Sequence, residues 1–421
     1  MPKRILLIGG NFLPEPTGIG KYNGEMMEWL CEHDYECCVV TTYPYYPQWK
    51  LKEQYKHARW YKKEIITPKK NLQSKGKIIL YRCPHYIPKN PTGKTRILHD
   101  FSFFISALFM VFYLLFRKRY DAVINVTPPL IPGLLAVLYK KIKSAKLICH
   151  IQDLQVDAAN DLQMIKSKKL IKILFGLEKY ILKHADIVSS ISPGMIKKIN
   201  SKINKEVIFF PNWSDTSFFY PIDDKAALKK EFGFATGDTI VLYSGAIGEK
   251  QGLESILYSA KELENIPSLK FIICGSGPYR EKLEEMAKKM EIINLFFLSL
   301  QPLEKFNGFL NMADIHLVIQ KINAGDLVMP SKLTNILAVG GLSIVTANPG
   351  TSLYELLDHY KMGIIVEPEQ QQALNNGIMV ALQKQNQEYR NNARAYAQEN
   401  LSIDTVMRRF LNDANMIANY R

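Results

Sequence analysis

The sequence predicts an α/β protein of two doubly wound, Rossmann-like domains that face each other across a cleft. The first observation is an alternation of short apolar runs, typical of buried strands, with helical patterns along the whole chain. The second is length, since 421 residues are enough for two or three domains. The third is composition: 47% hydrophobic and 22% charged residues are typical of a globular chain with a large core.

Strand-like runs occur in both halves of the chain. In the first half they are Arg4–Ile8, Glu36–Thr41, Ile78–Arg82, Ala122–Asn125, Lys146–His150, Ile187–Ser190 and Val207–Phe210. In the second half they are Ile240–Tyr243, Leu269–Cys274, Leu295–Leu298, Ile315–Ile319 and Ser343–Thr346. Helical patterns between them include Tyr22–His33, Leu130–Lys140 and Lys168–His184. This alternation predicts parallel sheets covered by helices.

The clearest break in the chain is the stretch "FFPNWSDTSFFYPIDD", residues 209–224, which holds two prolines and changes from strand to polar loop. We therefore expect an N-terminal domain over residues 1–210 and a second over 211–385. The polar helical segment 386–421 is expected to cross back to the first domain.

Charge and cysteine content narrow the function classes. A net charge of +14 and a pI of about 9.2 indicate an anionic partner: acidic lipid, nucleotide-sugar phosphate or nucleic acid. The usual nucleic-acid motifs are missing, which disfavours the last. The six cysteines form no C-x-x-C pair and lie in or beside apolar runs, so we interpret them as buried thiols of a cytoplasmic protein. No metal is expected.

Glycine loops follow three of the predicted strands. In "NFLPEPTGIGKYNGEM", residues 11–26, Gly18 and Gly20 precede a predicted helix, as phosphate-binding loops do, although a plain Pro/Gly turn explains them too. In "YSGAIGEKQGLE", residues 243–254, Gly245 is followed by Lys250, which we expect near the next helix start. In "CGSGPYREKLEE", Gly275 and Gly277 precede a helix expected to open at Pro278.

The segment "PSKLTNILAVGG", residues 330–341, is the most specific signal. Pro330 and Ser331 suit a helix start, with the serine as the expected N-cap. Lys332 then stands in the first turn, where a cation opposes the helix dipole, so an anion bound there would explain it. Asn335 lies three residues later on nearly the same face.

Two candidate catalytic residues follow a predicted strand in "CHIQDLQVD", residues 149–157. His150 and Asp153 are placed to orient or deprotonate an acceptor hydroxyl. The alternative is a buried histidine and a helix-capping aspartate, and the sequence leaves both interpretations open.

Together these motifs resemble the retaining glycosyltransferases of family 4, which have the GT-B architecture, and within them the capsule- and colanic-acid-type branch. Besides the four glycine and lysine segments above, "TYPYYPQW" (42–49), "NVTPPLIPG" (125–133) and "PNWSD" (211–215) support the resemblance, which covers nearly the whole chain. It implies transfer of a sugar from a nucleotide donor, expected to be a UDP-sugar, which the second domain binds, to a lipid-linked or saccharide acceptor.

The resemblance also implies roles for individual residues. Lys250 matches the family's lysine that neutralises the donor diphosphate, and Lys332 matches the lysine of the branch's P-S-K motif. The loop with Gly18 and Gly20 matches the one that closes on the phosphates, and Gly245, Gly275, Gly277 and Ser331 are expected beside the donor. Many relatives have a pair of glutamates in this segment, and Asn335 stands here at the position of the second one. Asp326, the nearest acidic residue upstream, is not aligned to the position of the first. The pair is therefore not conserved in this chain.

The uncharged stretch "FSFFISALFMVFYLLF", residues 101–116, is followed by Arg117, Lys118 and Arg119. It is short for a membrane span, so we expect a helix that is buried in its domain or lies in the surface of an acidic membrane. The expected location is the inner face of the cell membrane, with peripheral attachment. Two alternatives to a transferase are also compatible with the sequence: a nucleotide-sugar epimerase of GT-B type, and a non-catalytic nucleotide-sugar-binding module.

Overall fold

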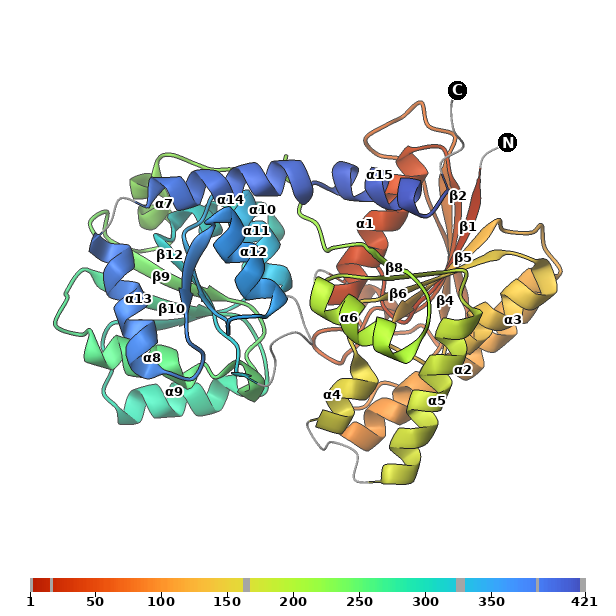
Figure 1. Cartoon of the computed structure of the whole chain (residues 1–421), viewed down its shortest axis with the longest axis horizontal. Helices are drawn as coiled ribbons and strands as arrows, with labels where there is room; N and C mark the ends of the chain where they lie inside the picture. The colour runs from red at the N-terminus through yellow and green to blue at the C-terminus, as the bar shows by residue number, and fades with distance from the viewer. Residues whose placement is uncertain (1–2, 16–17, 162–166, 323–329, 384–385, 417–421) are drawn as a thin grey trace. The chain divides into compact units, whose positions relative to one another are not determined.

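The computed structural model describes residues 3–15, 18–161, 167–322, 330–383 and 386–416 (Figure 1). The chain forms two compact units. Unit 1 comprises Met1–Pro211 together with Met407–Arg421, and unit 2 comprises Asn212–Val406.

Unit 1 contains an eight-stranded sheet with the order β3-β4-β2-β1-β5-β6-β7-β8. All its neighbouring strands are parallel except the edge pair β3 and β4. The strands are β1 (Arg4–Ile8), β2 (Glu36–Thr42), β3 (Lys62–Ile66), β4 (Lys77–Cys83), β5 (Ala122–Thr127), β6 (Lys146–Ile151), β7 (Ile187–Ser190) and β8 (Val207–Phe209).

Helices connect and cover these strands, as parallel pairing requires. They are α1 (Gly18–Glu32), the 3-10 turn η1 (Glu53–Tyr55), α2 (Gly93–Leu115), α3 (Gly133–Lys143), α4 (Gln155–Asp161), α5 (Lys168–His184) and α6 (Pro193–Lys202). Helix α2 packs on β2, β4 and α3. A Thr92–Thr95 capping box, in which each side chain bonds the other's backbone N–H, starts α2.

Unit 2 contains a six-stranded parallel sheet with the order β11-β10-β9-β12-β13-β14. Its strands are β9 (Thr239–Ser244), β10 (Leu269–Cys274), β11 (Leu295–Leu298), β12 (Ile315–Val318), β13 (Ser343–Thr346) and β14 (Gly363–Val366). The order reverses between β9 and β12, so the loops that follow these two strands mark the place where doubly wound sheets bind ligands.

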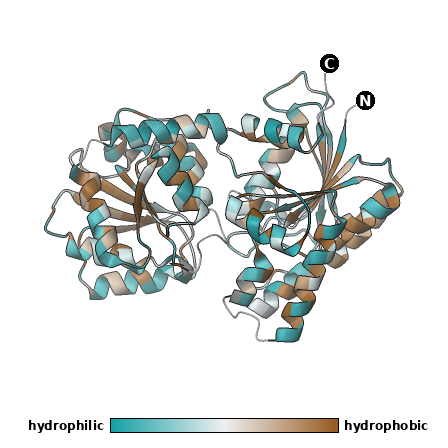
Figure 2. Ribbon diagram, viewed as in Figure 1, coloured by the Kyte–Doolittle hydropathy of each residue, from teal (hydrophilic) through white to brown (hydrophobic). Residues whose placement is uncertain are grey.

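The helical elements of unit 2 alternate with its strands. They are α7 (Lys225–Glu231), η2 (Glu249–Gln251), α8 (Glu254–Glu262), α9 (Arg280–Lys289), α10 (Leu303–Met312), α11 (Ser331–Ala338), α12 (Ser352–Tyr360), α13 (Gln371–Gln383) and α14 (Gln387–Asn400). In both units the central strands are hydrophobic (Figure 2), because a parallel sheet is buried on both faces.

Most predicted strands are found within one or two residues of their expected bounds, but some expectations were wrong. Helix α1 begins at Gly18, not Tyr22, so Gly18 and Gly20 belong to its first turn. Helix α9 begins at Arg280 rather than Pro278. Strands β3 and β14 were not predicted: β3 is a half-exposed, charged edge strand, and β14 is an edge strand that begins at a glycine.

The C-terminal segment expected over 386–421 divides between the two units. Helix α14 packs on α11 inside unit 2, whereas the chain from Met407 onward belongs to unit 1. That return is made by helix α15 (Ile403–Asp413). The ring of Phe410 stacks on Phe210 with centroids 4.0 Å apart, and Lys146 Nζ donates to the Ala414 carbonyl at 2.6 Å.

We predict that Phe410→Ala destabilises the protein by about 3–5 kcal/mol, because it removes a buried aromatic ring and leaves a cavity beside Phe210. Denaturant unfolding followed by circular dichroism measures this. Arg409→Ala, at the exposed neighbouring position, is the control and is expected to change stability by less than about 0.5 kcal/mol. Equal midpoints for the two variants would show that α15 does not depend on this contact.

Candidate active site

The glycine loops after β9 and β10 pack against each other in unit 2. A Cβ on Gly275 would lie 1.8 Å from the Gly245 carbonyl oxygen, and one on Gly277 would lie 2.0 Å from that of Ile247. The Ile247 amide donates to the Ser276 carbonyl at 3.0 Å. Close backbone packing therefore explains Gly275 and Gly277, and their predicted contact with a donor stays a prediction.

Lys332 lies in the first turn of α11, beside the loop that follows β9. Its Nζ is 3.6 Å from the centroid of the Tyr243 ring, a cation–π contact. A Cβ on Gly245 would lie 2.9 Å from the same Nζ, so only glycine leaves room for this lysine. Although Lys332 is partly exposed as a residue, its Nζ is shielded from solvent and has no hydrogen-bond partner in the described part of the chain.

This environment changes the acid–base chemistry of the lysine. Burial without a counter-charge lowers the pKa of Lys332 from 10.5 to about 7. Burial also raises the pKa of Tyr243, which therefore stays neutral beneath it. A buried ammonium without an ion pair is costly, and an anion at the same place would restore its charge. The predicted grouping of Gly245 with Lys332 is thus present within one unit.

The other two residues of the P-S-K segment have structural partners. Ser331 is not the N-cap: extended Pro330 occupies that position without a side-chain cap, so Ser331 is the first helical residue, and its carbonyl accepts a bond from the Thr334 hydroxyl. Asn335 Oδ1 accepts a hydrogen bond from the Ser214 hydroxyl at 2.8 Å. The expectation that Ser331 caps this helix was wrong. The predicted donor contacts of Ser331 and Asn335 stay predictions.

The backbone of Lys250 lies in η2, directly after Gly248. The side chain of Lys250 and the whole of Asp326 lie outside the described residues, so the match of Lys250 to a diphosphate-binding lysine stays a prediction.

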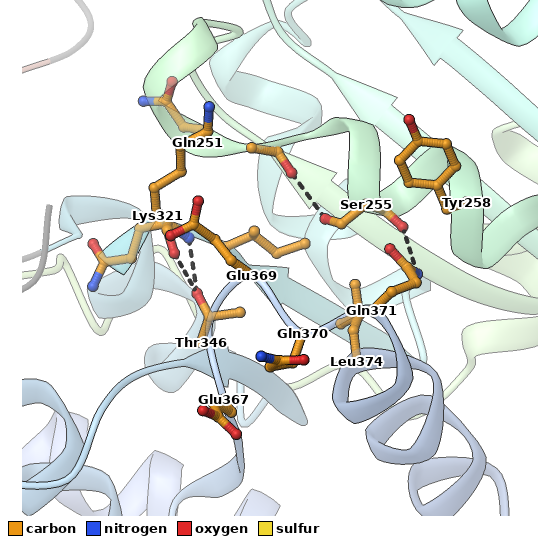
Figure 3. A pocket seen from close by; sticks show the side chains of 13 residues that line it. Gln251, Ser255, Tyr258, Lys321, Thr346, Glu367, Glu369, Gln370, Gln371 and Leu374 are labelled. Carbon is orange, nitrogen blue, oxygen red and sulfur yellow. Dashed lines mark hydrogen bonds between the residues drawn. The ribbon is translucent and has the colours of Figure 1, made fainter. Parts of the chain in front are cut away.

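A pocket of about 240 Å³ opens beside η2 at the carboxyl ends of β12, β13 and β14 (Figure 3). Its lining residues are Gln251, Gly252, Ser255, Tyr258, Ile319, Gln320, Lys321, Thr346, Glu367, Glu369, Gln370, Gln371 and Leu374. Much of its polar lining is already paired: the Thr346 hydroxyl bonds both backbone groups of Gln320, and Gln371 Nε2 donates to the Ser255 carbonyl. Lys332 does not line this pocket.

In unit 1, the glycine segment after β1 is organised by a buried carboxylate. Glu15 accepts bonds from the backbone amides of Tyr45 and Tyr46, each at 3.0 Å, and from Asn11 Nδ2 at 2.9 Å. Burial raises the pKa of Glu15, and these bonds oppose that shift. A Cβ on Gly20 would lie 2.6 Å from Glu15 Oε2, so Gly20 makes room for the carboxylate.

Gly18 lies at the start of α1 with φ of 61°, a left-handed conformation that favours glycine. Turn geometry at Gly18 and packing at Gly20 therefore explain the pair. Their predicted closure on donor phosphates stays a prediction.

The two predicted catalytic residues differ in their surroundings. His150, near the end of β6, is buried, with Nδ1 3.0 Å from the Ser189 hydroxyl and its ring 4.8 Å from that of Phe210. Burial lowers the pKa of His150 to about 3, so its imidazole is neutral at physiological pH. Asp153 follows β6 by two residues and is half-buried. Both catalytic roles stay predictions, and only Asp153 is partly open to solvent.

The six cysteines are buried free thiols, as expected. Among the residues that the structure describes, no three His, Cys, Asp or Glu side chains are grouped to hold a metal ion.

Comparison with known proteins assigns the family. A family model described as "Glycosyl transferases group 1" matches residues 224–400. The putative colanic acid biosynthesis glycosyl transferase WcaI of Escherichia coli K12 is 40% identical over 97% of this chain and 99% of its own length. The chain belongs to the group 1 glycosyltransferases. The resemblance and the class of enzyme inferred from the motifs are confirmed.

Solved structures confirm the GT-B fold class. Sucrose-phosphate synthase from Thermosynechococcus elongatus superposes with a TM-score of 0.73 at 15% identity, covering 98% of each chain. Anabaena HepE, solved with UDP and glucose, has a TM-score of 0.69 at 12% identity, covering 99% of this chain and 100% of that one. WaaG, a glycosyltransferase involved in lipopolysaccharide biosynthesis, has a TM-score of 0.66 at 12% identity, with 99% and 100% covered.

The sequence analysis did not identify two residues that organise the candidate sites, one in each unit. Tyr243 supports Lys332, and its only sequence signal is its place two residues before Gly245 at the end of a strand. Glu15 was passed over as part of a "PEP" turn. Its place between Pro14 and Pro16 gives no signal of a buried carboxylate.

We predict that Lys332→Met stabilises the free enzyme most below pH 7. There the folded protein holds a buried, unpaired charge. Between pH 7 and 10.5 the unfolded chain binds a proton that the folded protein lacks, so this penalty fades as pH rises. Thermal unfolding at pH 6.5 and pH 9 measures the difference.

The control is Lys229→Met, which removes a buried lysine that is paired with Asp314 at 2.8 Å and should lower stability instead. A Lys332→Met variant that is less stable than the wild type at both pH values would contradict the assignment of Lys332 as an uncompensated charge.

Proposed function

We propose that this glycosyltransferase moves a sugar from a nucleotide-sugar donor, a UDP-sugar, to a lipid-linked or saccharide acceptor in surface polysaccharide biosynthesis, with retention of anomeric configuration. The observation that supports it most is the shielded Nζ of Lys332, without a partner in the described chain, beside Gly245 at the switch point of unit 2. Colanic acid biosynthesis for WcaI, lipopolysaccharide biosynthesis for WaaG and the UDP bound to HepE agree with this proposal.

The donor chemistry needs positive charge where the nucleotide diphosphate leaves. The bond between the anomeric carbon and the diphosphate oxygen breaks, and negative charge grows on that oxygen. Lys332 supplies a cation, and the first turn of α11, which has no side-chain cap, supplies a positive dipole at the same place. Lys250 is proposed as the second cation. Lysines perform this task without a metal, and we propose a metal-free enzyme.

The acceptor chemistry is assigned to unit 1. The acceptor hydroxyl oxygen bonds to the anomeric carbon, and Asp153 is the proposed group that orients it or takes its proton. His150 is assigned a positioning role, since its contact with Ser189 ties β6 to β7 just before Asp153.

We predict that Lys332→Ala and Lys250→Ala each lower kcat about 10²–10³-fold, because each removes a charge from the developing anion. The measurement is radiolabelled sugar transfer from a panel of UDP-, GDP- and dTDP-sugars to membrane lipid extracts, with product analysis in the absence of acceptor to detect epimerisation. Lys288→Ala, an exposed lysine of the same unit, should retain activity. Near-normal turnover of both test variants would refute the donor-site assignment.

We also propose that unit 1 attaches peripherally to acidic membrane through α2. Its stretch Thr95–Leu115 is the one helix in the described chain that is long and apolar enough to cross a membrane by length and composition. However, its inner side, including Phe103, Ala107 and Val111, is buried against the unit. The outer face of α2, taken to include its C-cap Phe116, comprises exposed Ile97, Leu98, Phe101, Ile105, Phe109, Phe112 and Phe116. A helix packed on one side and apolar on the other suits the membrane surface.

The surroundings of this outer face support the same proposal. Trp60 is 74% exposed, and the neighbouring Tyr61 hydroxyl donates to the Ser106 carbonyl of α2 at 2.8 Å. Exposed Arg117, Lys118 and Arg119 follow the helix. Aromatic rings with basic flanks are typical of protein surfaces that contact anionic lipid headgroups.

We predict that the enzyme floats with phosphatidylglycerol vesicles at low salt and less so at high salt, because screening weakens the attraction of its basic residues. Phe109→Asp should weaken binding at least about tenfold, since it removes roughly 1.5–3 kcal/mol of apolar burial in the bilayer. Leu303→Asp is the control, because Leu303 in unit 2 is 62% exposed against 64% for Phe109. Equal flotation of these two variants would contradict docking through α2.

A further inference from the structure

An aromatic cluster lies in unit 1 where the loop after β2 meets the first turns of α2. The buried rings of Tyr45 and His99 have centroids 4.5 Å apart, and His85 lies 5.0 Å from His99. His99 Nδ1 donates to the Tyr86 carbonyl at 2.6 Å. Burial lowers the pKa of both histidines, so they are neutral at physiological pH, and the buried rings form an uncharged aromatic cluster.

Half-buried and exposed side chains lie around this aromatic cluster. We call Tyr46, Trp49, Arg96, Asp100 and Gln155 the head-group cluster. The Trp49 ring lies 5.2 Å from Tyr45 and 5.4 Å from His99, and the Arg96 guanidinium lies 5.2 Å from the Trp49 centroid. Arg96 is exposed and forms no ion pair with any residue that the structure describes.

Asp100 adds a second polar function to the cluster. Burial raises the pKa of Asp100 to about 7, against the opposing effects of a hydrogen bond from Gln155 and the charge of Arg96. Near neutral pH this carboxyl group can accept a hydrogen bond or donate one, as a sugar hydroxyl requires. Gln155 begins α4, two residues after Asp153, so the cluster is joined by a hydrogen bond to the segment that holds the proposed acceptor base.

The head-group cluster shares two helical turns with the outer face of α2. Arg96 and Asp100 alternate along the helix with exposed Ile97, Leu98 and Phe101. An aromatic ring, a cation without an ion pair in the described chain and a half-buried carboxyl group therefore lie directly beside an uncovered apolar surface. The aromatic ring would recognise a sugar ring, the cation a phosphate and the carboxyl group sugar hydroxyls, while the apolar surface would recognise a lipid chain.

We propose that the head-group cluster binds the polar end of a lipid-linked acceptor, a saccharide joined to a membrane lipid through a phosphate or diphosphate. Trp49 stacks on the sugar, Arg96 binds the phosphate, and Asp100 with Gln155 bonds the sugar hydroxyls, while the lipid stays in the membrane beside the outer face of α2. This inference rests on the proposed transfer reaction and selects the lipid-linked acceptor over the free saccharide.

The test measures binding of the full-length enzyme to three probes: a prenyl diphosphate-linked hexose in neutral phosphatidylcholine vesicles, the same vesicles without it, and hexose 1-phosphate in solution. The wild type should bind the lipid-linked probe at least tenfold more tightly than either other probe. Arg96→Gln and Trp49→Ala should each lose at least tenfold of that affinity. Arg409→Gln, the same change at an exposed arginine of α15, should retain it.

A thermal shift with UDP, measured on every variant, separates this inference from the proposed function, because the donor is assigned to unit 2. Failure of UDP to stabilise the wild type would count against the donor proposal and leave the acceptor result standing. Equal binding of empty vesicles, equal binding of hexose 1-phosphate, or unchanged affinity in both cluster variants would each overturn the head-group cluster. Arg96→Gln alters an exposed side chain, so the test does not depend on the folding of Trp49→Ala.

Discussion

The approach of a lysine ammonium to a glycine backbone is the contact on which the site of unit 2 depends. Gly245 has no Cβ, so Lys332 Nζ reaches the end of β9 and lies over Tyr243. That position shields the charge from water and from protein partners in the described chain, and it costs stability at the pH where the enzyme would work. The stability cost of a buried, unpaired ammonium is expected at a functional site that binds a ligand. An anionic diphosphate bound to Lys332 would remove this cost.

In unit 1 too, a glycine leaves room for a charged side chain, but here the charge is negative. Gly20 leaves room for the Glu15 carboxylate, which binds the backbone amides of Tyr45 and Tyr46. This contact holds the aromatic loop after β2 against the start of α1, and the loop in turn brings Trp49 to Arg96. Parallel strands gather their loops at one edge of the sheet. A single buried carboxylate can therefore organise residues that are far apart in the sequence.

The two proposals for unit 1 depend on one another through α2. Its inner side is part of the core, its outer face is uncovered, and its first two turns hold Arg96 and Asp100. Docking of the outer face would bring membrane lipid to the level of the head-group cluster, so that a lipid-linked substrate need not leave the bilayer. The helix would thereby connect location to substrate choice, which neither the family nor the fold specifies by itself.

The sequence by itself determined the fold class, nearly all strands, the family and the position of Lys332, because hydrophobic alternation and a cation in a first helical turn are local signals. It failed at the start of α1, since glycine is a poor helix former, and at the charged edge strand β3. Only the tertiary structure decided which glycines serve packing, that Asn335 is bound to Ser214, and that His150 is buried. It alone brought Trp49, Arg96 and Asp100 together, because contacts between loops of separate strands leave no periodic signal in a single sequence.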